Sequence, residues 1–499
     1  MKFRNPLVRS ILERYRRIWA IEHAVSLMDW DLETYMPPEG IWERAVARGE
    51  LSVLHRELVL QEDFVSLVER AGEEKDLTPW EAGVVRVLRR EIEKLRKIPP
   101  GLIYEMKKTT SEAFQAWKIA REKNDFGKFA PYLARIVELT REMAERLGYE
   151  ERPYDALLDL HEEGLRTRTV ERTLGSLEGP LRRILERVEA GDLFAVRHPL
   201  EDKRYDRGAM RRVNERVLDL LGFPRSRARM DVSPHPFTSE IGMSDVRITT
   251  RYEGFDFKRS LLSTVHEFGH ALYGLQIDEE LRMTPVGCGV GLGIDEGQSR
   301  FWENVVGRSP AFAEIIKPVL DEELGFTREY DPSEIYRYMA TVRRGVIRTE
   351  ADEVTYNLHI ILRFRLELGI IEGELRVEDL PEVWEQESER LLGVRPASQA
   401  EGVLQDVHWS HGSIGYFPTY TLGNILASMT AEKMERELGP VEELLRGGRI
   451  EEMKRYLGDL VHRHGATYPP GELLRMKFGG GYEPVALLKY LERKYLGGA

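Results

Sequence analysis

Residues 266–270 read His-Glu-Phe-Gly-His, between LLSTV at 261–265 and ALYGL at 271–275. The apolar flanks predict that this stretch lies inside a buried helix. The two histidines then lie on one face of that helix, one turn apart, where their imidazoles can hold zinc. Glu267 can reach a water on that metal as a general base, an arrangement typical of metal-assisted amide hydrolysis. The alternative is a helix whose two partly buried histidines only satisfy each other or the backbone.

A third ligand is expected on the segment that follows the metal-binding helix. Glu296 lies 26 residues after His270, in the stretch GIDEGQSRFWE at 293–303. A carboxylate there would complete a His₂Glu site that keeps one position open. Asp295 and Glu303 are alternatives, because most acidic residues on a helix are simply solvated. The third ligand is therefore expected among these three residues.

The composition indicates a soluble globular protein. The chain has 499 residues, of which 42% are hydrophobic and 32% charged, and its formal net charge is −12. No basic stretch occurs, so no nucleic-acid partner is expected. The high charged fraction resembles the ion-pair networks on the surfaces of thermophile proteins. Cys288 is the only cysteine, which excludes an intrachain disulfide and suits a cytoplasmic location.

Helical periodicity dominates the sequence. Leu7, Ile11, Tyr15, Ile18 and Ile21 form one apolar stripe, which predicts an amphipathic helix and not a signal peptide. No run of 18 apolar residues occurs, so no membrane span is expected. Because no Gly/Ser linker or repeat interrupts the pattern, residues 1–499 are interpreted as a single helical catalytic domain.

Two segments depart from the helical pattern. Residues 241–254, IGMSDVRITTRYEG, alternate polar and apolar side chains and predict a β-strand just before the metal-binding helix. Residues 286–294, VGCGVGLGI, predict a flexible glycine-rich connection to the next helix. This loop lacks the lysine of a phosphate-binding loop, so a connecting role is the better interpretation.

Together with HEFGH, four further motifs resemble the carboxypeptidase Taq family of metallocarboxypeptidases. These motifs are DVRIT at 245–249, DEGQ at 295–298, IRTEAD at 347–352 and GVLQDVHW at 402–409. They occur in the family's order, and the similarity extends over the whole chain. One position departs from the family pattern: Asp295 stands where the family usually has His, which makes the surroundings of the metal more negative.

The resemblance implies a mostly α fold, a large helical saddle-shaped single body with a deep central groove and a small β-sheet near the metal site. It implies one divalent metal per chain, zinc or cobalt, held by His266, His270 and Glu296. It also implies a thermostable, cytoplasmic homodimer that releases single residues from the free C-termini of peptide substrates, with broad specificity.

The tetrahedral intermediate of peptide hydrolysis needs hydrogen-bond donors besides the metal. Candidates cluster in HWSHGSIGYFPTY at 408–420. His408 and Tyr420 are expected to be catalytic, and His411 and Tyr416 are expected to contact the substrate. The alternative is that this Gly/Pro/aromatic stretch is only a packed loop.

An exopeptidase must also recognise a free carboxylate, which arginine binds best through its fork of N–H donors. Arg348 and Arg247 lie in the family motifs and are expected to bind it. His235 is a further candidate for contact with the substrate. The alternative for Arg348 is a surface ion pair with Asp352, four residues later.

A metallocarboxypeptidase is thus the main hypothesis. The nearest alternative is an oligoendopeptidase or dipeptidyl carboxypeptidase on the same scaffold, and an arginine one residue beyond the scissile bond would argue against it. A different class is a peptide-binding protein without catalysis. The intact Glu267 and the complete ligand set argue against that class.

Overall fold

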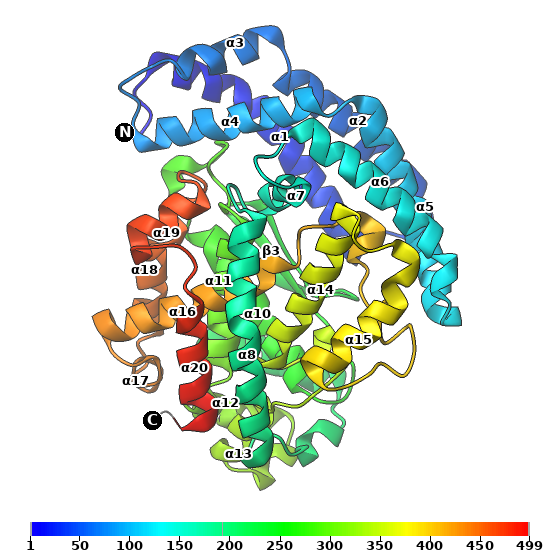
Figure 1. The fold of residues 1–499 in the computed structure, drawn as a ribbon. Helices are drawn as coiled ribbons and strands as arrows, with labels where there is room; N and C mark the ends of the chain where they lie inside the picture. The colour runs from blue at the N-terminus through cyan, green and yellow to red at the C-terminus, as the bar shows by residue number, and fades with distance from the viewer. Residues whose placement is uncertain (1, 192, 498–499) are drawn as a thin grey trace. The chain divides into compact units, whose positions relative to one another are not determined.

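The helical pattern of the sequence is borne out by the computed structural model, which describes residues 2–191 and 193–497. These residues form twenty α-helices and one three-stranded sheet (Figure 1). In helix α1 (Pro6–Thr34), Ile11, Tyr15, Ile18 and Ile21 are buried, as the apolar stripe predicts. The predicted fold class, mostly α with a small sheet, is confirmed. Within the described ranges, no helix combines the length and the apolar character needed to cross a bilayer.

The chain folds as two compact units, and each unit is built from three separate segments. Unit 1 comprises Met1–Arg96, His198–Met339 and Thr430–Gly479, and unit 2 comprises Lys97–Arg197, Ala340–Met429 and Gly480–Ala499. A single catalytic domain with a saddle shape and a central groove stays a prediction.

Unit 1 contains the sheet and most of the helices. Helix α1 packs against α2, α3 and strand β2, and α10 packs against β2, β3, α9 and α11. Besides α1, the helices of this unit are α2 (Ile41–Val59), α3 (Glu62–Ala71), α4 (Pro79–Lys97), α9 (Arg207–Leu220), α10 (Lys258–Gln276), α11 (Leu292–Arg300), α12 (Pro310–Glu323), α13 (Pro332–Met339), α17 (Val441–Arg446), α18 (Ile450–Leu460) and α19 (Pro470–Phe478).

Among its described residues, unit 2 consists of helices and loops and contains no β-strand. Helix α5 packs against α6, α14 against α15, and α8 against α20 (Figure 1). Its helices are α5 (Pro100–Lys123), α6 (Ala130–Leu147), α7 (Pro153–His161), α8 (Thr167–Gly191), α14 (Thr355–Glu372), α15 (Leu380–Leu392) and α20 (Pro484–Leu496). Helix α16 (Pro418–Leu438) contains the boundary between the two units, after Met429.

The sheet of unit 1 has strand β3 (Asp245–Thr250) in the middle. β3 pairs in parallel with β1 (Ala228–Val232) and antiparallel with β2 (Thr238–Gly242). The strand predicted before the metal-binding helix is therefore confirmed as β3, whereas β1 and β2 were not predicted. At the end of β1 the burial is opposite to residue type: Asp231 is buried and Val232 is 50% exposed. Apolar alternation could not reveal such a strand.

Helix α10 follows the sheet and contains the HEFGH stretch. Its side chains are buried almost all round, which is typical of a helix inside a protein core and not at its surface. The glycine-rich stretch that follows is the predicted connection, and it ends where α11 begins at Leu292. Together β2, β3, α10 and α11 form the frame of the candidate site (Figure 1).

Candidate metal centre

Helix α10 presents two histidines at a partly open position. His266 and His270 lie one turn apart, and their side chains are 17% and 16% exposed. Helix α11 lies very close to this turn because Gly269 has no side chain: a Cβ at Gly269 would lie 2.5 Å from the Cα of Ser299. This close approach brings Glu296 of α11 to the two imidazoles.

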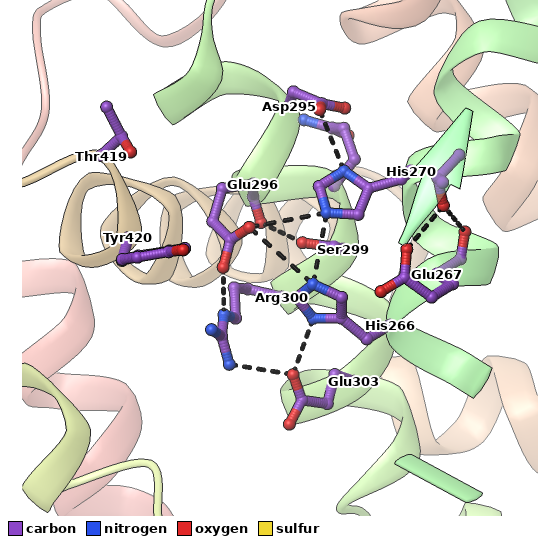
Figure 2. Close-up of polar contacts among 12 residues, drawn as sticks. His266, Glu267, His270, Asp295, Glu296, Ser299, Arg300, Glu303, Thr419 and Tyr420 are labelled. Carbon is purple, nitrogen blue, oxygen red and sulfur yellow. Dashed lines mark hydrogen bonds and ion pairs between the residues drawn. The ribbon is translucent and has the colours of Figure 1, made fainter. Parts of the chain in front are cut away.

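Three donor atoms converge in unit 1 (Figure 2). The Nε2 atoms of His266 and His270 are 3.2 Å apart. Oε2 of Glu296 lies 3.8 Å from Nε2 of His266 and 3.5 Å from Nε2 of His270. Tetrahedral zinc with Zn–N bonds of about 2.0–2.1 Å needs donors roughly 3.3 Å apart. The three residues predicted as ligands therefore lie together, at a spacing that suits one divalent ion.

Each imidazole has a carboxylate at its other ring nitrogen (Figure 2). Oε2 of Glu303 lies 2.9 Å from Nδ1 of His266, and Oδ2 of Asp295 lies 3.0 Å from Nδ1 of His270. Such carboxylates keep the ring proton on Nδ1 and leave Nε2 with its lone pair. Two ring nitrogens and a carboxylate oxygen then face one another, which either a proton or a metal ion between them stabilises. The donor set fits a metal, and Asp295 and Glu303, the alternative ligands, lie around the three predicted ligands instead.

Two arginines balance the acidic residues of the site. Arg300 donates from Nε to Oε1 of Glu296 (2.6 Å) and from Nη1 to Oε2 of Glu303 (2.9 Å), and Arg308 donates to Oε1 of Glu303 (3.0 Å). Burial would raise the pKa of both glutamates, but Arg300 and His266 hold each pKa well below its ordinary value. Both carboxylates are therefore ionised at neutral pH. Sequence reasoning missed both arginines, although the i,i+4 spacing of Glu296 and Arg300 was an available signal.

Charge also acts on His270. Burial alone would lower the pKa of this imidazole, but Asp295 and Glu296 raise it well above its ordinary value. The site therefore favours positive charge at His270, supplied either by a proton or by a metal. Because a metal must displace that proton, metal affinity should fall in acid.

Glu267 is the candidate general base, and a neighbouring strand holds its carboxylate. Thr238 of β2 donates from Oγ1 to Oε2 of Glu267 at 2.6 Å. Glu267 is buried, with 6% of its surface exposed, and it is not among the converging donors. Thr238 could not be singled out from the sequence, because β2 was not predicted.

Arg348 lies in unit 2 within a buried ionic cluster. The alternative interpretation, a surface ion pair with Asp352, is therefore wrong. Its Nε donates to Oδ1 of Asp406 (2.9 Å) and its Nη1 donates to the hydroxyl of Tyr356 (3.0 Å). Arg363 donates from Nε to Oδ2 of Asp406 at 2.7 Å. Burial would raise the pKa of Asp406, but Arg363 and Arg348 hold that pKa well below its ordinary value. Asp406 of the GVLQDVHW motif thus holds Arg348 of the IRTEAD motif in place.

Three of the predicted residues gather beside Arg348. Nε2 of His408 lies 3.2 Å from the hydroxyl oxygen of Tyr420, and the ring of Tyr416 packs against both rings. The guanidinium carbon of Arg348 lies 5.3 Å from the centre of the Tyr420 ring. Burial and the charge of Arg348 lower the pKa of His408 to about 3. His408 is therefore neutral at neutral pH, with one ring N–H to donate.

The other residues predicted to contact the substrate each lie in a different environment. Arg247 donates from Nε and Nη2 to the two oxygens of Asp245, each at 2.8 Å, and its guanidinium carbon lies 4.3 Å from the ring centre of Trp30. His235 is exposed in the turn between β1 and β2. His411 is exposed and packs on a phenylalanine ring of α5. Contact of these residues with a substrate stays a prediction.

Comparison with known proteins agrees with the motifs. The family model described as Carboxypeptidase Taq (M32) metallopeptidase matches residues 10–495. The chain is 52% identical over 495 residues to "Thermostable carboxypeptidase 1" of Pyrococcus furiosus, covering 99% of each chain. It is 36% identical over 504 residues to "Thermostable carboxypeptidase 1" of Thermus thermophilus, covering 98% of each chain. The solved Pyrococcus furiosus carboxypeptidase superposes with a TM-score of 0.98 at 51% identity, covering 99% of this chain and 100% of that chain.

Proposed function

Because the chain belongs to the carboxypeptidase Taq (M32) family of metallopeptidases, we propose that it removes single amino acids from the free C-termini of peptides, with broad specificity. It is accordingly a peptide hydrolase. The observation that carries the proposal is the convergence of Nε2 of His266, Nε2 of His270 and Oε2 of Glu296.

The proposed cofactor is one divalent ion per chain, zinc or cobalt. Two imidazoles and one carboxylate with an open position are typical of catalytic zinc sites. When bound, such an ion lowers the pKa of a water ligand and polarises the scissile carbonyl. Arg300 engages Oε1 of Glu296, so that Oε2 remains for the ion.

Glu267 is the proposed general base. Its carboxylate takes a proton from the attacking water and later delivers that proton to the leaving amine. The hydrogen bond from Thr238 to Oε2 of Glu267 fixes the orientation of the carboxylate, which leaves Oε1 for proton transfer. Support comes from the position of Glu267 next to a ligand on α10, outside the ligand set itself.

The cluster of unit 2 is proposed to recognise the substrate and to stabilise the oxyanion. Asp406 and Tyr356 each accept one N–H from Arg348. A guanidinium has five N–H donors, so donors remain for a C-terminal carboxylate. His408 and Tyr420 are the proposed donors to the oxyanion.

The remaining predicted contacts are kept in the proposal as residues that touch the substrate. Arg247 assists Arg348 at the C-terminal carboxylate, and His235, Tyr416 and His411 contact the rest of the peptide. We also propose a cytoplasmic homodimer, supported by the family resemblance and by the single cysteine. Light scattering on purified protein tests the oligomeric state.

One unmodified peptide distinguishes the proposed activity from its nearest alternatives. Mass spectrometry after incubation should show a ladder of single-residue losses from the C-terminus. Internal cuts would indicate an oligoendopeptidase, and losses in steps of two residues would indicate a dipeptidyl carboxypeptidase. The matched control is the same peptide with an amidated C-terminus, which should be cleaved more slowly because Arg348 loses a charged hydrogen-bond partner, at a cost of roughly 1.5–3 kcal/mol. Equal cleavage of both peptides would contradict an exopeptidase.

A further inference from the structure

A second group of metal-ligating side chains lies in the first segment of unit 1. Glu22 of α1, His55 of α2 and Glu91 of α4 come from three different helices. Among the described residues, this group and the His266–His270–Glu296 group are the sets whose donor atoms all lie within 4.8 Å of one another. None of the five sequence motifs includes a member of the second group.

The donor atoms of the second group converge as closely as those of the metal centre. Nε2 of His55 lies 3.1 Å from Oε1 of Glu22 and 3.5 Å from Oε1 of Glu91. The corresponding shortest separations in the metal centre are 3.2 and 3.5 Å. A ring nitrogen carries at most one proton, so Nε2 can donate to only one of the two carboxylates at a time. A cation at the centre would instead engage all three donor atoms at once.

A further contact orients the ligand atoms. The hydroxyl of Tyr15 donates to Oε2 of Glu22 at 2.8 Å, so Oε1 is the oxygen that faces His55. Arg300 engages one oxygen of Glu296 in the same way and leaves the other for the histidines. A fixed partner on the second oxygen holds a carboxylate in a geometry that suits one-oxygen coordination.

The charges of the group also favour a cation. Two carboxylates share one imidazole, and bringing like charges together costs free energy that a divalent ion would offset.

We propose that Oε1 of Glu22, Nε2 of His55 and Oε1 of Glu91 bind a second divalent transition-metal ion, which links helices α1, α2 and α4. An imidazole nitrogen with two carboxylates suits zinc, cobalt or manganese better than calcium or magnesium, which prefer oxygen ligands only. The three side chains are 37%, 21% and 28% exposed, so the ion can exchange with solvent. The role of this ion is structural, because no acidic residue of the group is left over as a base.

The test is a count of bound metal. The full chain is stripped of metal and dialysed against cobalt or zinc, and the metal bound per chain is then counted by inductively coupled plasma mass spectrometry. Wild type should bind about two ions per chain, because each group is an independent site. Glu22→Gln and Glu91→Gln should each bind about one ion and keep peptide hydrolysis, whereas His270→Asn should bind about one ion and lose hydrolysis. The two kinds of variant separate the second site from the proposed catalytic site.

A matched control and a second readout complete the experiment. Glu57→Gln makes the same charge change at an exposed position of α2 and should leave the count unchanged. Added cobalt or zinc should raise the melting temperature of His270→Asn, and this shift should disappear when Glu22→Gln is combined with it. A wild-type count of about one, or an equal count in wild type, Glu22→Gln and Glu91→Gln, would overturn the proposal.

Discussion

At Glu296 the two carboxylate oxygens have different partners. Arg300 takes Oε1 at 2.6 Å, while Oε2 faces the Nε2 atoms of the two histidines. A carboxylate held in this way coordinates through one oxygen and leaves a position open for water or substrate. The guanidinium thus orients the carboxylate ligand as Glu303 and Asp295 orient the imidazoles.

Glu267→Gln should separate metal binding from catalysis. The substitution removes a base and not a ligand, so the metal content should stay while the rate falls by about 10²–10⁴-fold. Metal analysis and peptide hydrolysis on the same preparation provide the two measurements. His270→Asn is the comparison, since it should lose the ion of the catalytic site and the rate together. If Glu267→Gln also lost the metal, the roles assigned to Glu267 and Glu296 would be reversed.

Asp295, where the motif resemblance leads us to expect His, lies 3.0 Å from Nδ1 of His270. Asp295→Ala should weaken metal affinity by roughly 10–100-fold, because the ring loses the partner that orients it. Asp295→Asn keeps an acceptor without the charge and should lose less. Asp295→His should remain active with a changed preference between zinc and cobalt. Titration of both metals into stripped protein measures these effects, and identical affinities in all variants would show that Asp295 has no role.

At the scale of elements, the metal centre depends on how closely α11 approaches α10. Alanine is favoured over glycine inside a helix by roughly 0.5–1 kcal/mol. At Gly269, however, a Cβ would lie 2.5 Å from the Cα of Ser299, and backbone cannot rotate away as a side chain can. Overpacking of this kind costs about 1–3 kcal/mol, so the steric effect outweighs the helical preference.

Gly269→Ala should therefore lower the melting temperature and weaken metal binding, since Glu296 moves away from the histidines with α11. The matched control is Gly175→Ala in α8, where a Cβ would meet nothing within 4 Å. That control should raise stability slightly through helix propensity. Thermal unfolding and metal titration of both variants decide the question. A stabilised Gly269→Ala with unchanged affinity would refute the idea that this contact sets the ligand geometry.

The elements differ in how far sequence could predict them. Helix α10 and strand β3 were predictable because their apolar periodicity is local. The pair His266 and His270 follows from motif spacing, whereas Glu296 was singled out by the family resemblance. The contacts of Glu303 were not predictable from α-helical spacing. Helix α11 continues into a π-helical turn (Phe301–Gly307), which changes the direction in which its side chains point. Strand β1 was missed because a buried Asp231 and an exposed Val232 reverse the pattern of burial.

At the scale of the whole molecule, the chain passes between the two units after Arg96, Arg197, Met339, Met429 and Gly479. The residues of the metal centre all belong to the segment His198–Met339 of unit 1, and the Arg348 cluster belongs to Ala340–Met429 of unit 2. Each site could therefore be predicted from nearby motifs. The division into units depends on packing between distant segments, which no local pattern encodes.

Four histidines, of which His359 and His462 are buried, make the stability of the molecule depend on pH. Burial lowers the pKa of His408 and His462 to about 3 and that of His464 to about 4, and it holds the pKa of His359 well below its ordinary value. In the unfolded chain each titrates near 6.5. Between about pH 6.5 and 4, the unfolded chain therefore binds more of these protons than the folded chain does. The free energy of unfolding consequently falls as the pH falls through this window.

Two buried glutamates act in the opposite direction. Burial, helped by the charge of Asp295, raises the pKa of Glu240 to about 8, and burial raises that of Glu367 to about 7. Each is protonated in the folded chain and ionised in the unfolded chain above about pH 4.5, so each adds stability as the pH falls towards 4.5. The histidines outnumber the glutamates, so between about pH 6.5 and 4.5 the unfolded chain binds more of these protons than the folded chain does. These groups together should therefore destabilise the protein on acidification.

His462 isolates one of these contributions. Its side chain is fully buried, and its Nδ1 and Nε2 lie 2.7 and 2.9 Å from the side-chain amides of Gln276 and Gln298, which can each present either oxygen or NH₂ to a neutral ring. Burial lowers its pKa to about 3. His462→Gln removes the group that must gain a proton on unfolding, so acid should destabilise this variant less than wild type. For each pH unit of acidification between about pH 6 and 4, the free energy of unfolding of wild type should fall by about 1.4 kcal/mol more than that of the variant. Unfolding of metal-stripped protein by guanidinium chloride at several pH values measures this effect. As a control, His235→Gln replaces an exposed histidine, and its free energy of unfolding should depend on pH as that of wild type does. If the pH dependence of His462→Gln also matched wild type, His462 would be protonated in the folded chain as readily as in the unfolded chain.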